Sequence, residues 1–293
     1  MSKEAFLVVD EKALLGEGPS WDDRKNVLYW VDIMGENIHC YHPETQKNQT
    51  IAVGQHPGAV VVHQSNELIA AMQHGFYLVD FEQGTWKAIV DPEENIPNNR
   101  FNDGKCDPAG RFWAGTMAYD KQRDQAFLYC LESDYTLSVK LDNVGISNGL
   151  AWDLDKNTMY YIDTPTRQVS AFDYDVTSGA ISNRRTIITF SEDAGSPDGM
   201  TIDSEGMIWI AHYRGWKVSR WNPDNGECID EIKVPASQVT SCVFGGEDLK
   251  TLYITTARNN LSDDQLLKEP HAGGVFAINL DVKGTPSDRF GGV

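Results

Sequence analysis

The sequence predicts an all-β fold, a six-bladed β-propeller with a central channel. A unit of short strands recurs six times along the 293 residues, at intervals of 41 to 50 residues, which is the spacing of propeller blades. No stretch has sustained helical periodicity, and the turns are rich in Asp, Asn and Gly. A chain of this length fits one propeller, because all-β folds of this kind form single domains of this size.

The clearest evidence for the repeat is a pair of segments, residues 16–38 and 147–169, that align without a gap. The Trp-Asp pair that begins at Trp21 falls on the pair that begins at Trp152. In both segments a short apolar strand ends near this Asp, and a polar turn leads to a strand rich in aromatic and β-branched residues, a pattern typical of antiparallel strands. The same pattern recurs at residues 58–81, 101–132, 196–223 and 239–281.

The two ends of the chain predict how the ring closes. The last unit has no obvious fourth strand, since residues 276–280 are followed only by a segment containing Gly, Pro and charged residues. Residues 5–9 form an unassigned apolar strand at the other end. We expect this strand to be the outer strand of the last blade, because closure removes an open sheet edge. No linker or shift in composition divides the chain, so the sequence predicts one domain, residues 1–293.

Composition limits the partners and the compartment. The chain has 25 Lys and Arg against 43 Asp and Glu, a net charge of −18, which disfavours nucleic acids and anionic membranes as partners. Its five cysteines are widely spaced and form no C-x-x-C motif, a pattern typical of reduced thiols. With no signal peptide or membrane span in the sequence, we expect a cytoplasmic protein. Monomer and dimer both remain open.

One sequence position indicates a binding site in the channel. Because blades are arranged radially, residues in the same register should lie at the same height along the axis. Five residues before the end of each first strand the side chains are mostly acids and amides. They are Glu17, Gly58, Asn102, Asn148, Asp198 and Val239. Converging carboxylates repel one another unless a cation lies between them.

The residue types suggest which cation. Two carboxylates and two amides, with no His or Cys, are hard oxygen ligands that suit Ca²⁺, Mg²⁺ or Mn²⁺ better than a structural zinc. A single such residue would be explained as a turn former, but four of six units in one register favour a metal site. In the third unit the register count favours Asn102, whereas the pattern of an acid or amide followed by Gly favours Asp103.

Five segments resemble the family of regucalcin (senescence marker protein), gluconolactonases and the luciferin-regenerating enzyme. They are LLGEGPSWD (14–22), RFNDGKCDPAGRFWAGTM (100–117), SNGLAWD (147–153), SPDGMTID (196–203) and TSCVFGG (240–246). The resemblance implies a six-bladed propeller with one divalent ion in its channel, Ca²⁺, Zn²⁺, Mg²⁺ or Mn²⁺. It implies that Glu17, Asn148 and Asp198 are the metal ligands.

The same resemblance implies a substrate and an activity. Arg100 and Asn102 fall on substrate-binding positions, which favours Asn102 over Asp103, and an acidic lid residue of some relatives falls near Asp120. We therefore expect a metal-dependent hydrolase that opens a sugar lactone, with Asp198 as the candidate catalytic base. The segment at Tyr119 and Asp120 departs from the acidic pair of animal relatives, so the particular sugar is left open.

Two alternatives remain. The first is a non-catalytic, calcium-binding regulatory protein of the regucalcin type that uses the same site. The second is a related enzyme that acts on another ester or on a nitrile, like the luciferin-regenerating relatives. Arg100 favours a substrate over a simple cation buffer, because a nearby positive charge would not help to hold a cation.

Overall fold

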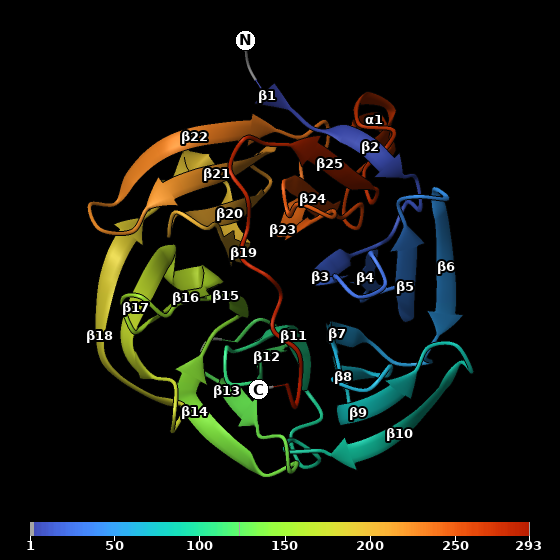
Figure 1. Ribbon diagram of the computed structural model, residues 1–293. Coiled ribbons are helices and arrows are strands. Elements are labelled where there is room, and N and C mark those ends of the chain that lie inside the picture. Colours follow the sequence, from blue (N-terminus) through green and yellow to red (C-terminus); the bar gives the residue numbers. More distant parts are fainter. Residues whose placement is uncertain (1–2, 123, 293) are drawn as a thin grey trace.

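The computed structural model confirms the predicted fold class. It describes residues 3–122 and 124–292, so positions 1, 2, 123 and 293 of the expected domain lie outside it. Within this described part, twenty-five strands form six sheets, and the sheets are arranged in a ring around a central axis (Figure 1). Each sheet is one blade, and within a blade consecutive strands pair antiparallel from the axis outward.

The blades are numbered here in chain order, and their strands are given from the axis outward. Blade 1 contains β3 (Gly16–Asp22), β4 (Val27–Asp32), β5 (Asn37–His42) and β6 (Lys47–Ala52). Blade 2 contains β7 (Pro57–Val62), β8 (Leu68–Met72), β9 (Gly75–Asp80) and β10 (Thr85–Val90). Blade 3 contains β11 (Asn99–Cys106), β12 (Phe112–Ala118), β13 (Ala126–Leu131) and β14 (Leu137–Val144).

The second half of the ring repeats this plan. Blade 4 contains β15 (Ser147–Asp153), β16 (Thr158–Asp163), β17 (Gln168–Asp175) and β18 (Ala180–Thr189). Blade 5 contains β19 (Ser196–Ile202), β20 (Ile208–Tyr213), β21 (Lys217–Asn222) and β22 (Glu227–Lys233). Blade 6 contains β23 (Val239–Gly245), β24 (Thr251–Thr256), β25 (Val275–Asn279) and β2 (Phe6–Val9).

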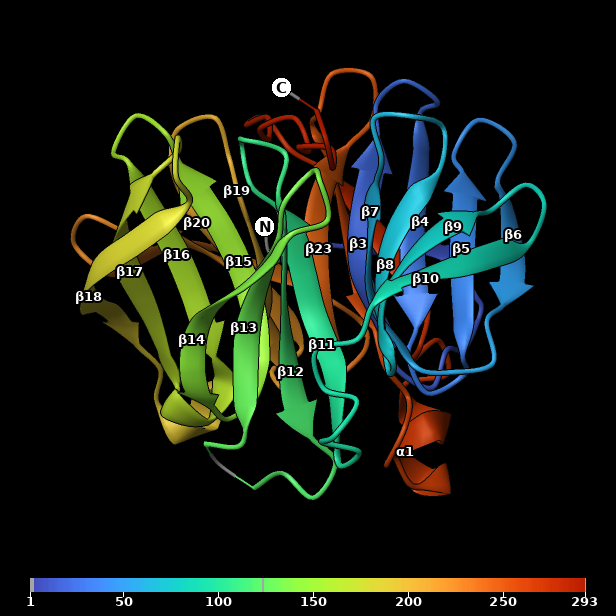
Figure 2. The same cartoon turned by 90° about the horizontal axis from the view of Figure 1, so that it is seen from below.

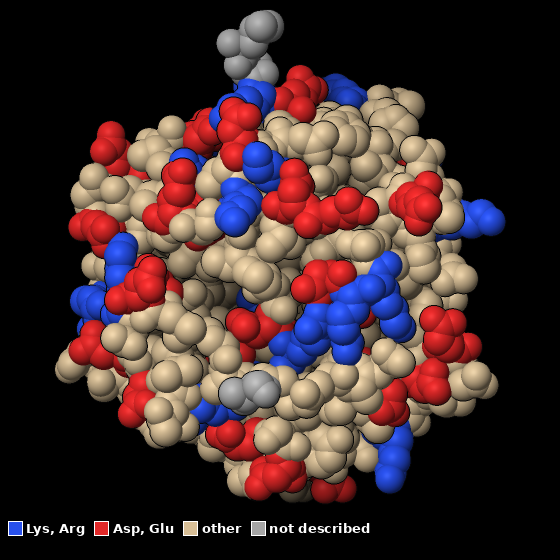
Figure 3. Space-filling view, viewed as in Figure 1, with Lys and Arg blue, Asp and Glu red and all other residues tan. Residues whose placement is uncertain are grey.

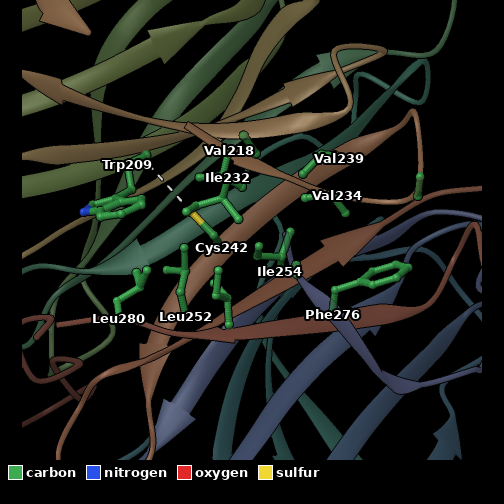
Figure 4. Close-up of a cluster of buried hydrophobic side chains, with 14 of the residues drawn as sticks. Trp209, Val218, Ile232, Val234, Val239, Cys242, Leu252, Ile254, Phe276 and Leu280 are labelled. Atoms are coloured by element: carbon green, nitrogen blue, oxygen red, sulfur yellow. Dashed lines mark hydrogen bonds between the residues drawn. The ribbon is translucent and has the colours of Figure 1, made fainter. Parts of the chain in front are cut away.

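The core lies between neighbouring blades, because the inner two strands of each blade are buried on both faces. Figure 4 shows the cluster between blades 5 and 6, where Trp209 and Cys242 meet among aliphatic side chains. The rings of Trp209 and Phe244 pack edge to face with centroids 5.7 Å apart. Each Å² of apolar surface that is buried contributes about 25 cal/mol, so these contacts between blades stabilise the ring.

The N-terminal segment contacts two blades. β2 pairs antiparallel with β25, the position that the sequence assigned to residues 5–9. β1 (Lys3–Glu4) pairs in parallel with β22 and adds a fifth strand to blade 5. This second pairing was not predicted, since two residues are too short to show a strand pattern.

The C-terminal tail, residues 281–292, crosses one mouth of the channel (Figures 1 and 2). Gly284 forms a bridge to Asp203 at the end of β19, and Phe290 forms one to His63 after β7. The Phe290 side chain is fully buried and stacks on Tyr135. Tail residues and the inner strands of all six blades together line a cavity of about 60 Å³, so the tail covers this end of the channel.

The loops that precede the inner strands lie at the opposite end of the channel. α1 (Asp263–Lys268) projects at this end, away from the C-terminus (Figure 2). On the tail-covered face, acidic and basic side chains are interspersed around the rim (Figure 3). Within the described ranges, no helix combines the length and the apolar character that crossing a bilayer requires.

Candidate functional site

A β-bulge occurs in each of the six inner strands, close to the start of the strand. In β15, Ser147 pairs with Asp163 and Leu150 pairs with Tyr161. β15 therefore advances by three residues where β16 advances by two, so β15 contains one extra residue. The other inner strands have a one-residue shift at the same place. A bulge turns a side chain away from its regular alternation. The repeated bulge therefore explains how one register presents polar side chains to the channel.

The three predicted ligands lie on different blades, at the end of the channel opposite the C-terminal tail. Glu17 belongs to β3, Asn148 to β15 and Asp198 to β19, and each is the second or third residue of its strand. All three side chains are buried. Gly58 and Val239 hold the same register on blades 2 and 6, so the polar side chains come from the other four blades.

A chain of hydrogen bonds links blades 3, 4 and 5 across the site. Arg100 Nη1 donates to Asn102 Oδ1 at 2.9 Å, and Asn102 Nδ2 donates to Asn148 Oδ1 at 3.2 Å. Asn148 Nδ2 donates to Thr164 Oγ1 at 2.7 Å, and this hydroxyl donates to Pro197 O at 2.8 Å. Because the Thr164 hydroxyl must accept from Asn148, the chain fixes which way the Asn148 amide faces.

The two carboxylates of the site are in an unfavourable electrostatic environment. Burial, followed by the charges of Asp198 and Asp103, raises the pKa of Glu17 well above its ordinary value. Burial and the charge of Asp103 raise the pKa of Asp198 in the same way. Asp198 Oδ1 is buried and has no hydrogen-bond partner among the described residues. A buried acceptor without a partner is costly, so these groups favour a positive ligand.

A divalent cation fits this set of side chains. Glu17 and Asp198 supply carboxylate oxygens, and Asn148 supplies an amide oxygen whose direction Thr164 fixes. Across residues 3–122 and 124–292, no group of three or more His, Cys, Asp or Glu is arranged to hold a metal. A metal site here therefore depends on the amide as third ligand, and such oxygen ligands suit Ca²⁺, Mg²⁺ or Mn²⁺.

Arg100 and Asn102 belong to β11, and Asn102 contacts the proposed ligand Asn148. Arg100 is buried, and burial lowers the pKa of its guanidinium to about 10 although the charges of Tyr119, Glu17 and Asp198 act in the opposite direction. Arg100 Nη1 also donates to Phe101 O at 2.8 Å. The charges of Glu17 and Asp198 act on this guanidinium, so it is placed to bind oxygen atoms of a molecule held near them.

The loop after β12 begins with Tyr119 and Asp120, which make different contacts. The Tyr119 hydroxyl is 2.6 Å from Nδ1 of His56, which joins the loop of blade 3 to a loop of blade 2. Burial raises the pKa of Tyr119 and lowers that of His56, and in both groups the charge of Arg100 acts to lower the pKa, so this pair lies near the guanidinium. Asp120 is exposed and accepts a hydrogen bond from Gln122 N at 3.1 Å. Contact between Asp120 and a substrate stays a prediction.

Sequence reasoning missed several residues of the site. Thr164 follows β16 and His56 precedes β7, so neither is at the position that was counted in each unit. Only their contacts in the structure reveal them. Asp103 was set aside in favour of Asn102, yet it is buried and its charge acts on both site carboxylates. The bulge at Asn102 explains why two consecutive side chains can both face the channel.

Replacing Thr164 by Val should weaken divalent-ion binding roughly ten- to hundredfold, as loss of a residue that orients a metal ligand commonly does. The reason is that Val keeps the shape but cannot accept from Asn148 Nδ2 or donate to Pro197 O. Calorimetric titration with Ca²⁺ or Mn²⁺ measures the effect. Thr166→Val is the control, because that hydroxyl donates only to Asp163 O nearby. Equal affinities in both variants would show that Thr164 does not orient the site.

The chain is similar to known proteins over most of its length. The family model described as "SMP-30/Gluconolactonase/LRE-like region" matches residues 15–258. The protein named "Putative sugar lactone lactonase YvrE" of Bacillus subtilis (strain 168) is 43% identical over 289 residues, which cover 99% of each chain. Regucalcin of Xenopus laevis is 40% identical over 291 residues, which cover 97% of each chain.

Solved structures show the same fold. A luciferin-regenerating enzyme superimposes with a TM-score of 0.90 at 34% identity, covering 98% of this chain and 99% of that one. A calcium-binding protein, regucalcin, from Agrobacterium tumefaciens superimposes with a TM-score of 0.94 at 26% identity, covering 99% of this chain and 98% of that one.

Proposed function

The chain belongs to the SMP-30/gluconolactonase/LRE-like family, and from this premise we propose that it is a metal-dependent hydrolase that opens a sugar lactone. Membership supports a lactonase-type or regucalcin-like function. The observation that carries the more specific proposal is the position of Arg100 and Asn102. They are hydrogen-bonded to each other and, through Asn148, to the proposed cation ligands. A site that only stored a cation would have no use for this guanidinium.

In this proposal Glu17, Asn148 and Asp198 hold one divalent cation, which, when bound, polarises a carbonyl and lowers the pKa of water as a Lewis acid. Arg100 and Asn102 bind the ring oxygen or hydroxyl groups of the lactone. Asp198 also accepts the proton of the attacking water. The water oxygen forms a bond to the carbonyl carbon, the ring C–O bond breaks, and the leaving alkoxide takes the proton from Asp198 to give the open hydroxy acid.

Burial of the site supports this assignment. Arg100 and both carboxylates are buried, and electrostatic interactions in such a site are stronger than in water. The covered far end of the channel leaves the mouth beside Tyr119 and His56 as the route for a substrate. We place the protein in the cytoplasm, since its five cysteines are free thiols.

The decisive experiment measures acid release from glucono-, galactono- and xylonolactone with a pH indicator, against the spontaneous rate. Activity should disappear with a chelator and return when Ca²⁺, Mg²⁺, Mn²⁺ or Zn²⁺ is added. If the metal-loaded protein opens none of these lactones above background, the lactonase proposal fails. A calcium-binding regulatory role then becomes the better account, because relatives named regucalcin match the whole chain at about the same identity.

Replacing Arg100 by Ala should raise KM roughly ten- to hundredfold, the range expected for one lost charge-assisted hydrogen bond. It should lower kcat less, because the guanidinium holds the substrate before and during the reaction alike. Steady-state kinetics on gluconolactone measure both constants. Arg185→Ala, on the outer strand β18, is the control. Since Arg100 is buried, thermal unfolding and ion affinity of the variant must first match those of the wild type, and Arg100→Lys gives a second test.

A further inference from the structure

A groove of about 570 Å³ lies between blades 5 and 6, on the face opposite the C-terminal tail. One wall is the turn between β20 and β21, and the other is the segment around α1. Polar, aromatic and basic side chains line most of the groove. They include Arg214, Trp216, Asn260, Gln265, Lys268 and Glu269. None of them belongs to the proposed metal site.

The turn between β20 and β21 has an unusual backbone. Trp216 has φ 61°, and Arg214, two residues earlier, has φ 62°. In blades 1 and 4 the residue just before the third strand, Glu36 or Arg167, has a similar φ of 59° or 56°. The left-handed conformation of Trp216 is therefore a recurring feature of the turn before the third strand. Bulky residues such as Trp rarely adopt this conformation. Arg214 is a second such residue in one turn, and strain of this kind is concentrated at binding sites.

The two cations of the groove have no acidic partner. Neither Arg214 nor Lys268 takes part in an ion pair within the part of the chain that the structure describes. The neighbouring Lys217, by contrast, pairs with Glu231. The one acid of the groove, Glu269, is buried and accepts hydrogen bonds from Ser237 N at 2.6 Å and Ser237 Oγ at 2.9 Å. With this one carboxylate against two cations, the lining of the groove carries a net positive charge.

Tyr213 lies between the turn that forms one wall of the groove and the strand that carries Asp198. Tyr213 pairs with Ser196 in β19, two residues before Asp198. Burial raises the pKa of the Tyr213 hydroxyl, the charge of Arg214 acts to lower it, and the charges of Asp198 and Glu17 act to raise it. The Arg214 guanidinium lies 5.8 Å from the centroid of the Tyr213 ring. A molecule bound at the carboxylates can therefore extend past Tyr213 towards Arg214.

We propose that this groove is a subsite for an anionic substituent, a phosphate or a carboxylate, at the end of the substrate remote from the lactone carbonyl. Arg214 and Lys268 bind the anion, and the indole of Trp216, 45% exposed, packs against the connecting carbon chain. The net charge of −18 repels anions at long range, but this field is screened beyond about 8 Å at physiological salt. The inference names the substrate class and rests on the proposed lactonase function.

The kinetic test compares three lactones: gluconolactone, gluconolactone 6-phosphate and the lactone of glucaric acid. An anionic substrate should have a kcat/KM roughly tenfold higher than gluconolactone, the effect of one charge-assisted contact, and the phosphate and carboxylate arms identify which anion is preferred. Arg214→Ala and Lys268→Ala should each remove most of this preference and leave gluconolactone unaffected. Lys217→Ala is the matched control, because Lys217 lies one residue beyond the turn and pairs with Glu231.

A binding test separates this inference from the proposed reaction. In calorimetric titrations, glucitol 6-phosphate should bind the wild-type protein at least tenfold more tightly than glucitol, and the double variant Arg214→Ala, Lys268→Ala should lose the difference. Equal affinities in the wild type, together with equal kcat/KM values for the three lactones, would overturn the subsite. Phosphate-dependent binding without hydrolysis of any lactone would support the subsite and overturn the proposed reaction.

Discussion

Replacing Asp198 by Asn will lower kcat for lactone hydrolysis by about 10³-fold, within the range of a lost general base. Asparagine keeps the size of the side chain but removes the negative charge and the proton-accepting oxygen. The Asp198 side chain is buried in the site, and the variant leaves no proton-accepting carboxylate at this position. KM should change less than kcat, since Arg100 and Asn102 still bind the substrate.

The control for this variant is Asp103→Asn. Asp103 is also buried in the channel and its charge acts on Asp198, but its Oδ1 accepts a hydrogen bond from Gly104 N at 2.7 Å. Removing its charge should therefore reduce kcat far less than the Asp198 variant does. If Asp198→Asn retains activity within tenfold of the wild type, with unchanged ion affinity, Asp198 is not the base.

The ion-free protein should lose stability as the pH rises from about 4 to 8, and a divalent ion should reverse the loss. Burial raises the folded-state pKa of Glu17 and Asp198 above the unfolded value. The folded state then binds more protons than the unfolded state, so stability falls as pH increases through this window. An ion at 100 times its Kd would restore about 2.7 kcal/mol, and its binding should release protons.

Thermal unfolding at several pH values, with chelator and with Ca²⁺, measures this effect. Glu17→Gln removes one of the two charges, so its ion-free form should be more stable than the wild type at pH 8 and should gain little from the ion. Burial also raises the pKa of other carboxyls, such as Glu93 and Asp163. The difference between wild type and Glu17→Gln separates the site from that background. If Ca²⁺ stabilises the Glu17→Gln variant as much as the wild type, the cation binds elsewhere.

The fold was predictable because the repeat appears in the sequence itself. Counting back from the ends of the first strands placed Glu17, Asn148 and Asp198 in one register, and the structure puts these residues at the same end of three inner strands. The count worked because every inner strand carries the same one-residue bulge, so the register is shifted equally in all blades. The bulge itself left no pattern in the sequence.

The surroundings of the site were not predictable, because they come from residues outside the one position that was counted in each unit. Thr164 acts from a single turn of 3₁₀ helix, and His56 acts from a loop between blades. The tail closes the far mouth through Phe290, in a stretch that looked irregular in the sequence. Such contacts depend on distances in space, which strand periodicity does not encode.

The tail places the end of the chain on the face opposite the proposed entrance. Phe290 and Gly291 lie where the inner strands end, whereas Glu17 and Asp198 lie where they begin, and Figure 2 shows the C-terminus and α1 at opposite ends of the ring. A tag or surface anchor attached after the last residue would therefore hold the molecule with its channel mouth facing the solution. Immobilised protein oriented in this way should bind ions and substrates as the free protein does.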